Sequence, residues 1–230
     1  MLFYSNTNKG LQRQENQDAL GHIQVHEGTL FIVCDGISGL PNGAKASHTA
    51  LKNLKSSFSN LQHGSSKEKL KKAMQKAQIA VMKTNPKPLG TTIATCFVKN
   101  KTAHISWCGD SRVYHFRKNE ILWMTKDHNI LHDILNKPSS KKSFFRNPYA
   151  LNRFFGRNSL VESDYNSIKL EENDHILLCT DGLTNFISEN EILNYITTHS
   201  NIDSSKLLEN KLLSNTINAP DNFTWYIIKI

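Results

Sequence analysis

The feature that most constrains the fold is a long stretch of β-type sequence between residues 91 and 125. It reads TTIATCFVKNKTAHISWCGDSRVYHFRKNEILWMT and is rich in β-branched and aromatic residues, which favour strands. The polar tetrapeptides KNKT and RKNE interrupt it, so the stretch predicts three short strands. Because strands joined by such short turns run antiparallel, the chain is expected to contain an antiparallel meander.

Helical patterns come in pairs on both sides of this meander. Apolar residues recur at helical spacing over 43–62, 67–84, 188–199 and 204–217, with a shorter helix expected at 128–135. Further strands are expected at 29–36, 174–182 and 222–230. Strands and helices do not alternate regularly, which favours an α+β fold of stacked antiparallel sheets with helices on their outer faces. No linker or fixed-period repeat divides the chain, so we expect a single domain over 1–230.

Two of the expected strands end in the same way, on an Asp-Gly pair. LFIVCDGISG places Asp35 after an apolar run, and ILLCTDGLTN does the same for Asp181. Five aspartates share this position at a strand end: Asp18, Asp35, Asp110, Asp181 and Asp221. Each alone is typical of a turn. Together they indicate a cation site, because unpaired carboxylates repel one another and oxygen ligands suit Mg²⁺ or Mn²⁺.

Charge and composition bear on three kinds of partner: acidic molecules, nucleic acids and membranes. The net charge of +8 permits attraction to acidic molecules, yet arginines do not alternate with aromatic residues, so we expect no nucleic-acid partner. No apolar run approaches the roughly 18 residues of a membrane helix, and no signal peptide is recognisable. We therefore expect a cytoplasmic protein without membrane association, whose cysteines are buried thiols.

Seven short motifs occur in an order that resembles one known family. They are RxxNQD, VCDGxxG, GTT, GDSR, TKDH, TDGL and DNxT, running from about Gly10 to the C-terminus. In this order they resemble the PP2C-type (PPM) metal-dependent protein serine/threonine phosphatases, especially bacterial members that consist of the catalytic domain only. The resemblance implies a four-layer α/β/β/α sandwich of two antiparallel sheets flanked by helices.

The resemblance also implies a set of metal ligands. Asp35 and the backbone carbonyl of Gly36 would anchor two Mn²⁺ or Mg²⁺ ions. Asp181 and Asp221 would ligate the first ion from the other side, and Asp18 would lie near the same centre.

A third ion and a substrate contact are implied as well. Asp110 and Asp181 resemble the ligands of a third, weaker metal ion. Arg13 resembles the arginine that binds the substrate phosphate, so Arg13 and Asp35 are the expected catalytic residues. We read Asp127 first as a helix cap and second as a support for the site.

The implied reaction is hydrolysis of phosphoserine and phosphothreonine on proteins, by a metal-activated water that attacks phosphorus directly. The expected partners are phosphorylated proteins and an opposing bacterial Ser/Thr kinase, with the enzyme itself a monomer. The alternative is a catalytically weak PP2C-fold module that binds phosphoproteins and regulates signalling. A metal-dependent nuclease would fit the charge but not the ordered motifs. The basic segment 137–157 is either a solvated loop or a docking rim for acidic substrates.

Overall fold

The strands of the protein form two five-stranded antiparallel sheets. The computed structural model describes the whole chain except residues 38–39, 41, 85, 87, 132–133 and 135–149. One sheet has the order β1-β10-β9-β6-β7 and the other β2-β3-β4-β5-β8. The strands are β1 Leu2–Asn8, β2 Ala19–Val25, β3 Gly28–Cys34, β4 Ile93–Lys99, β5 Thr102–Cys108, β6 Arg112–Arg117, β7 Glu120–Met124, β8 Asp164–Lys169, β9 His175–Cys179 and β10 Phe223–Lys229.

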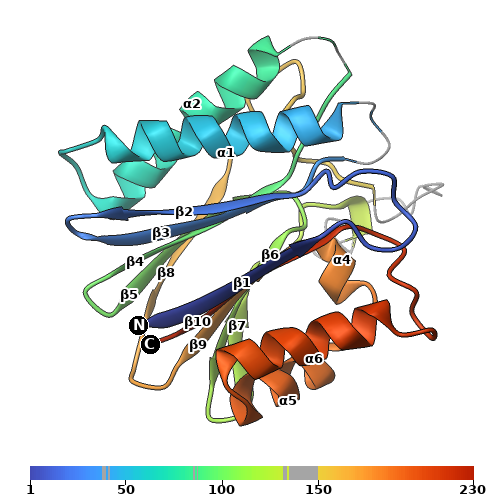
Figure 1. Ribbon diagram of the computed structural model, residues 1–230. Coiled ribbons are helices and arrows are strands. Elements are labelled where there is room, and N and C mark those ends of the chain that lie inside the picture. Colours follow the sequence, from blue (N-terminus) through green and yellow to red (C-terminus); the bar gives the residue numbers. More distant parts are fainter. Residues whose placement is uncertain (38–39, 41, 85, 87, 132–133, 135–149) are drawn as a thin grey trace.

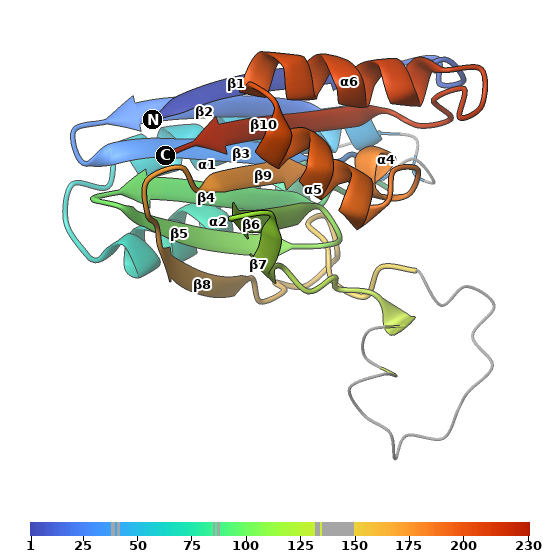
Figure 2. The ribbon, with the colours of Figure 1, turned by 90° about the horizontal axis from the view of Figure 1, so that it is seen from below.

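The two sheets lie face to face with helices on both outer sides (Figure 1). Helices α1 and α2 cover one sheet, and α5 and α6 cover the other, which confirms the expected four-layer α/β/β/α sandwich. The helices are α1 Gly43–Ser59, α2 Ser66–Lys83, α4 Asp181–Thr184, α5 Glu189–Thr198 and α6 Asn201–Leu213. Figure 2 shows α6 lying along β1 and β10, at one edge of its sheet.

Each sheet is buried on both faces, and strand β3 shows why its sequence is apolar throughout. Phe31 and Val33 pack in the core between the two sheets. Leu30 and Ile32 point the other way and pack in the core beneath α1 and α2. Because successive side chains of a strand point to opposite faces, a strand with a core on each side needs apolar residues at every position. Strand β9 follows the same rule, so both strands that carry Asp-Gly are firmly held.

Several elements differ from the sequence prediction. The expected meander is wrong: the Gly109–Ser111 turn divides its middle strand into β5 and β6, which belong to different sheets. The stretch therefore forms two separate hairpins, β4–β5 and β6–β7. Strands β1, β2 and β8 were not predicted, since their sequences mix polar and apolar residues without a long apolar run. The helix expected at 128–135 falls partly on residues outside the described ones. Helix α5 begins after Ser188, which forms a capping box with Glu191.

The strand register brings the ends of several strands to one end of the sandwich. Cys34 at the end of β3 pairs with Ala19 at the start of β2. Cys179 at the end of β9 pairs with Trp225 of β10 and with Arg112 at the start of β6. The two chain termini lie together at the opposite end (Figure 1). Residues just outside these paired strand ends must therefore meet at a single end of the molecule.

Two smaller predictions can be compared with the structure. All four cysteines are buried and free, as expected for reduced thiols. In the part of the chain that the structure describes, no helix has the length and apolar character needed to cross a membrane.

Candidate metal centre and active site

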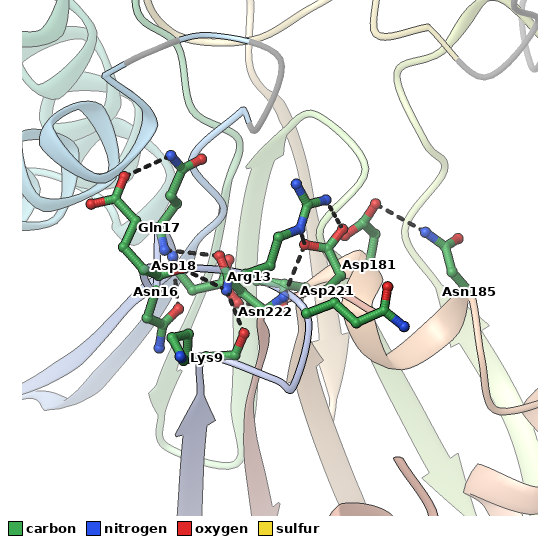
Figure 3. Close-up of polar contacts among 12 residues, drawn as sticks. Lys9, Arg13, Asn16, Gln17, Asp18, Asp181, Asn185, Asp221 and Asn222 are labelled. Carbon is green, nitrogen blue, oxygen red and sulfur yellow. Dashed lines mark hydrogen bonds and ion pairs between the residues drawn. The ribbon is translucent and has the colours of Figure 1, made fainter. Parts of the chain in front are cut away.

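All five aspartates from the sequence analysis lie at the same end of the sandwich. Asp18 precedes β2, Asp35 follows β3, Asp110 lies between β5 and β6, Asp181 opens α4 after β9, and Asp221 precedes β10. Figure 3 shows Asp181 and Asp221 close to Arg13, and the charges of both aspartates act on Asp18. Residues separated by most of the chain thus converge here, because antiparallel pairing places the start of one strand beside the end of the next.

Asp35 and Asp181 come from different sheets, and their carboxyl groups contact each other through a hydrogen bond. Burial raises the pKa of both groups, and the charges of Asp18 and Asp110 raise that of Asp35 further. Two carboxyl groups can share a hydrogen bond only when one of them carries a proton. A cation bound by both carboxylates would offset the same repulsion between them.

Asp18 and Asp110 are also poorly suited to remain ionised without a cation. Burial raises the pKa of Asp18 to about 7, against the opposing effect of hydrogen bonds from threonine hydroxyls. One of these runs from Thr180 Oγ1 to Asp18 Oδ2 over 2.9 Å. Burial, followed by the charge of Asp181, raises the pKa of Asp110 to about 7 as well. Burial disfavours the ionised form of both groups, and the neighbouring carboxylates disfavour it further.

Arg13 holds Asp221 in a two-pronged ion pair. The distances are 2.9 Å from Nε to Oδ1 and 2.9 Å from Nη2 to Oδ2. The arginine expected to bind phosphate therefore forms an ion pair with one of the expected metal ligands. A guanidinium pairs in the same geometry with a carboxylate or with two phosphoryl oxygens, so this position is compatible with either partner.

Asn222 organises the loop that carries Arg13, a role that sequence reasoning missed. Its Nδ2 donates to the carbonyl oxygens of Lys9 at 2.8 Å and Glu15 at 2.9 Å, so it joins the loop to the start of β10 (Figure 3). The DNxT motif contains this asparagine, but a short motif does not say which chain segment its side chain will bind.

Two glycines allow backbone segments to approach closely at the site. A Cβ at Gly182 would overlap the carbonyl oxygen of Asn222, so only glycine lets α4 pack against the start of β10. Gly36 follows Asp35 and donates its N–H to the carbonyl oxygen of Gln17 at 3.2 Å. The close packing at Gly182 brings the Asp181 and Asp221 backbones together.

The donor set fits a hard divalent cation. Among the described residues, no three His, Cys, Asp or Glu side chains are already arranged around one point to hold a metal ion. Asp221 is instead paired with Arg13, and Asp35 with Asp181. The five converging aspartates supply carboxylate oxygens, however, and the pKa values of four of them are raised. Carboxylate oxygens suit Mg²⁺ and Mn²⁺, so the residues present fit such ions once these contacts rearrange.

The fold and the site together define a class of protein: an α/β/β/α sandwich with a carboxylate-rich cation centre at one end of its sheets. Within this class, the sequence profile described as Protein phosphatase 2C matches residues 9–214. The chain therefore belongs to the protein phosphatase 2C family.

Named relatives agree with this assignment. The serine/threonine phosphatase Stp of Listeria welshimeri is 27% identical over 236 residues, covering 97% of this chain and 93% of that protein. The crystal structure of Stp1 from Staphylococcus aureus superposes with a TM-score of 0.87 at 24% identity, covering 99% of this chain and 94% of that one. The PstP catalytic domain in complex with two manganese ions gives a TM-score of 0.81 at 22% identity, covering 98% and 96%. At these identities the two solved structures establish the fold.

Proposed function

We propose that this protein is a divalent-metal-dependent protein phosphatase that hydrolyses phosphoserine and phosphothreonine on proteins. The observation that carries the proposal is the convergence of five aspartates and Arg13 at one end of a protein phosphatase 2C sandwich. The relative in Listeria is named a serine/threonine phosphatase. The reaction class is phosphoric monoester hydrolysis: a P–O bond to the serine or threonine oxygen breaks, and water supplies the new P–O bond.

In this proposal the aspartates hold the metal ions. Asp35 and the carbonyl oxygen of Gly36 would hold two ions, and Asp181 and Asp221 would be further ligands of the first. Asp18 would support the centre from the start of β2. When bound, the divalent ions supply a water of lowered pKa and offset the negative charge of the phosphoryl group. Either Mn²⁺ or Mg²⁺ suits these ligands, and the PstP neighbour was solved with manganese.

A third, weaker site would be formed by Asp110 and Asp181. These two carboxylates interact electrostatically, since the charge of Asp181 raises the pKa of Asp110. A cation between them would relieve that repulsion.

Arg13 would bind two oxygens of the phosphoryl group and hold the phosphorus in position for attack. Its present partner is Asp221. A cation held by Asp221 would offset the charge of this carboxylate and would weaken its pair with Arg13. We infer that Arg13 would then be available to bind the substrate phosphate.

The remaining parts of the proposal concern the cellular setting. We propose a single catalytic domain over 1–230 that acts as a cytoplasmic monomer on phosphoproteins, opposing a Ser/Thr kinase. Arg153 and Arg157 of the basic segment 137–157 lie among the described residues, and Arg153 is paired with Asp164. The other basic residues of that segment lie outside the described residues: Lys137, Lys141, Lys142 and Arg146.

The proposal is tested by assaying p-nitrophenyl phosphate and a phosphothreonine peptide with Mn²⁺ and with chelator. We expect turnover only with Mn²⁺, loss of at least about 100-fold in kcat for Asp35→Ala and Asp181→Ala, and none for Asp203→Asn. Asp203 is an exposed aspartate of α6, and so serves as the control. Wild-type activity in Asp35→Ala would refute the mechanism. Phosphopeptide binding without turnover in the wild type would support the regulatory module instead.

A further inference from the structure

The turn that carries Asp110 is held in place by His128. The Gly109 N–H donates to His128 Nδ1 at 3.1 Å, and the His128 N–H donates to the Gly109 carbonyl oxygen at 3.0 Å. The imidazole is 2% exposed and stacks on Trp107, with ring centroids 5.9 Å apart. One buried residue thus makes two hydrogen bonds to the residue directly before Asp110.

The hydrogen bonds of His128 define its tautomer. Because Nδ1 accepts a hydrogen bond from the Gly109 amide, the ring hydrogen must lie on Nε2. Nε2 lies 3.3 Å from Asp164 Oδ2, and the other carboxylate oxygen of Asp164 is 2.6 Å from Arg153 Nη1. Burial, followed by the charge of Arg153, lowers the pKa of His128 to about 4, so the ring is neutral in the physiological range. A chain of contacts therefore runs from the Asp110 turn to Arg153.

His128 also lies where two segments of the chain meet. Its carbonyl oxygen accepts the Asn152 N–H at 3.0 Å, and the next residue, Asn129, bridges to Leu151. The segment 150–156 that begins in this way continues to Phe155, which exchanges two backbone hydrogen bonds of 2.9 Å with Thr91. His128 thus fastens segment 150–156 to the Asp110 turn.

Thr91 and Thr92 connect these contacts to Asp35. Thr91 Oγ1 donates to the Asp35 carbonyl oxygen at 2.8 Å, and the Asp35 N–H donates to Thr92 Oγ1 at 3.1 Å. Thr92 Oγ1 lies 2.6 Å from Ser111 Oγ, directly after Asp110. A network of hydrogen bonds through Thr91, Thr92 and Ser111 therefore connects Asp35 with the Asp110 turn. Segment 150–156 contacts this network at Thr91, and His128 links the same segment to Gly109.

We propose that His128 is a positioning residue that sets the Asp110 carboxylate relative to Asp35 and Asp181, and thereby tunes the weakest divalent-cation site. The inference rests on the proposed metal-dependent function. Partners that orient metal ligands without touching the ion typically change metal affinity by about 10–100-fold when removed. The bidentate pair between Arg112 and Asp127, at 2.8 and 2.7 Å, braces the other side of the same turn. With that brace intact, loss of His128 should loosen the turn without releasing it.

The test is a Mn²⁺ titration that follows free Mn²⁺ by electron paramagnetic resonance, on the full chain. We expect His128→Ala to weaken the weakest binding step about 10-fold and to leave the tighter steps within about 2-fold. His128→Gln should recover most of the loss, because its amide can accept from Gly109 and donate to Asp164. His104→Ala is the matched control: His104 bonds the Tyr165 hydroxyl at 2.9 Å and lies near the start of β5, whereas the Asp110 turn follows the end of that strand.

A second variant keeps the test informative if His128→Ala does not fold. Asp164→Ala removes the carboxylate next to Nε2 but leaves the Gly109 bond, so a smaller weakening, about 3-fold, is expected. The proposal is overturned if His128→Ala binds all ions as the wild type does, if every step weakens equally, or if His104→Ala gives the same change. If the wild-type protein binds Mn²⁺ but has no phosphatase activity, the proposed function is refuted. The Mn²⁺ titration would still test whether His128 changes the weakest binding step.

Discussion

Two buried aspartates are expected to respond oppositely to the same substitution. Asp18 and Asp174 are 4% and 0% exposed, so each would ordinarily be a costly place to hold a charge. Asp18 lies among other carboxylates, whereas Asp174 accepts from Arg117 Nε at 2.8 Å and lies 2.8 Å from His115 Nε2. We predict that, in the metal-free protein, Asp18→Asn increases the free energy of unfolding and Asp174→Asn decreases it.

The magnitudes follow from the pKa values of the two groups. The pKa of Asp18 rises from 3.8 to about 7. Since one pKa unit corresponds to about 1.36 kcal/mol, ionised Asp18 costs roughly 4 kcal/mol near pH 7.5. Asparagine removes that cost and can still accept from the Thr180 hydroxyl, so we expect a gain of about 2 to 4 kcal/mol. The pKa of Asp174 is lowered to about 2 by its hydrogen bonds, against the effect of burial. Asp174→Asn should therefore lower the free energy of unfolding by about 2 to 3 kcal/mol.

The assay is urea denaturation at pH 7.5 with EDTA, followed by tryptophan fluorescence. For a chain of 230 residues, each kcal/mol should also move Tm by about 2–4 °C. Adding Mn²⁺ should stabilise the wild type more than Asp18→Asn, because metal binding to the folded state adds stability. Equal destabilisation by the two substitutions would refute the reasoning, since it would mean that Asp18 is satisfied without a cation.

Three further predictions follow from single contacts. Arg13→Ala should raise KM for a phosphopeptide about 10-fold or more while leaving Mn²⁺ binding no weaker, and a weakened Mn²⁺ affinity would count against its role at the phosphate. Gly182→Ala should cost at least about 2 kcal/mol, because the added methyl overlaps a backbone carbonyl; a smaller loss in urea denaturation would show that α4 can shift. Hydrogen bonds from Lys69 and Lys99 lower the pKa of Glu27 to about 2. The wild type should therefore be more stable than Glu27→Gln above pH 4.5, and the difference should vanish as the pH falls toward 2.

The candidate site was more predictable than some of the fold that supports it. Asp35 and Asp181 could be singled out because each follows a run of apolar residues, and a carboxylate in that place needs a partner. Strands β1 and β8 escaped prediction because they lie at sheet edges, where a mixed polar and apolar sequence suffices. Asp127, read first as a helix cap, instead binds Arg112 through two hydrogen bonds, and so supports the Asp110 turn.

The sequence by itself determined the local elements and the inventory of charged groups. Periodicity predicted the paired helices and the central strands, because side-chain spacing is a property of neighbouring residues. The order of the motifs indicated the family. None of this information specifies which distant residues touch, since pairing depends on the register of strands that are far apart in the chain.

Only the tertiary structure decided how those charges interact. Whether a buried aspartate has a raised pKa, as Asp18 does, or a lowered one, as Asp174 does, depends on neighbours supplied by other strands. The pairing of Arg13 with Asp221, 208 residues apart, and the contacts of His128 with the Asp110 turn likewise arise only when the sheets assemble. Electrostatic energy depends on distance in space, and sequence patterns report only distance along the chain.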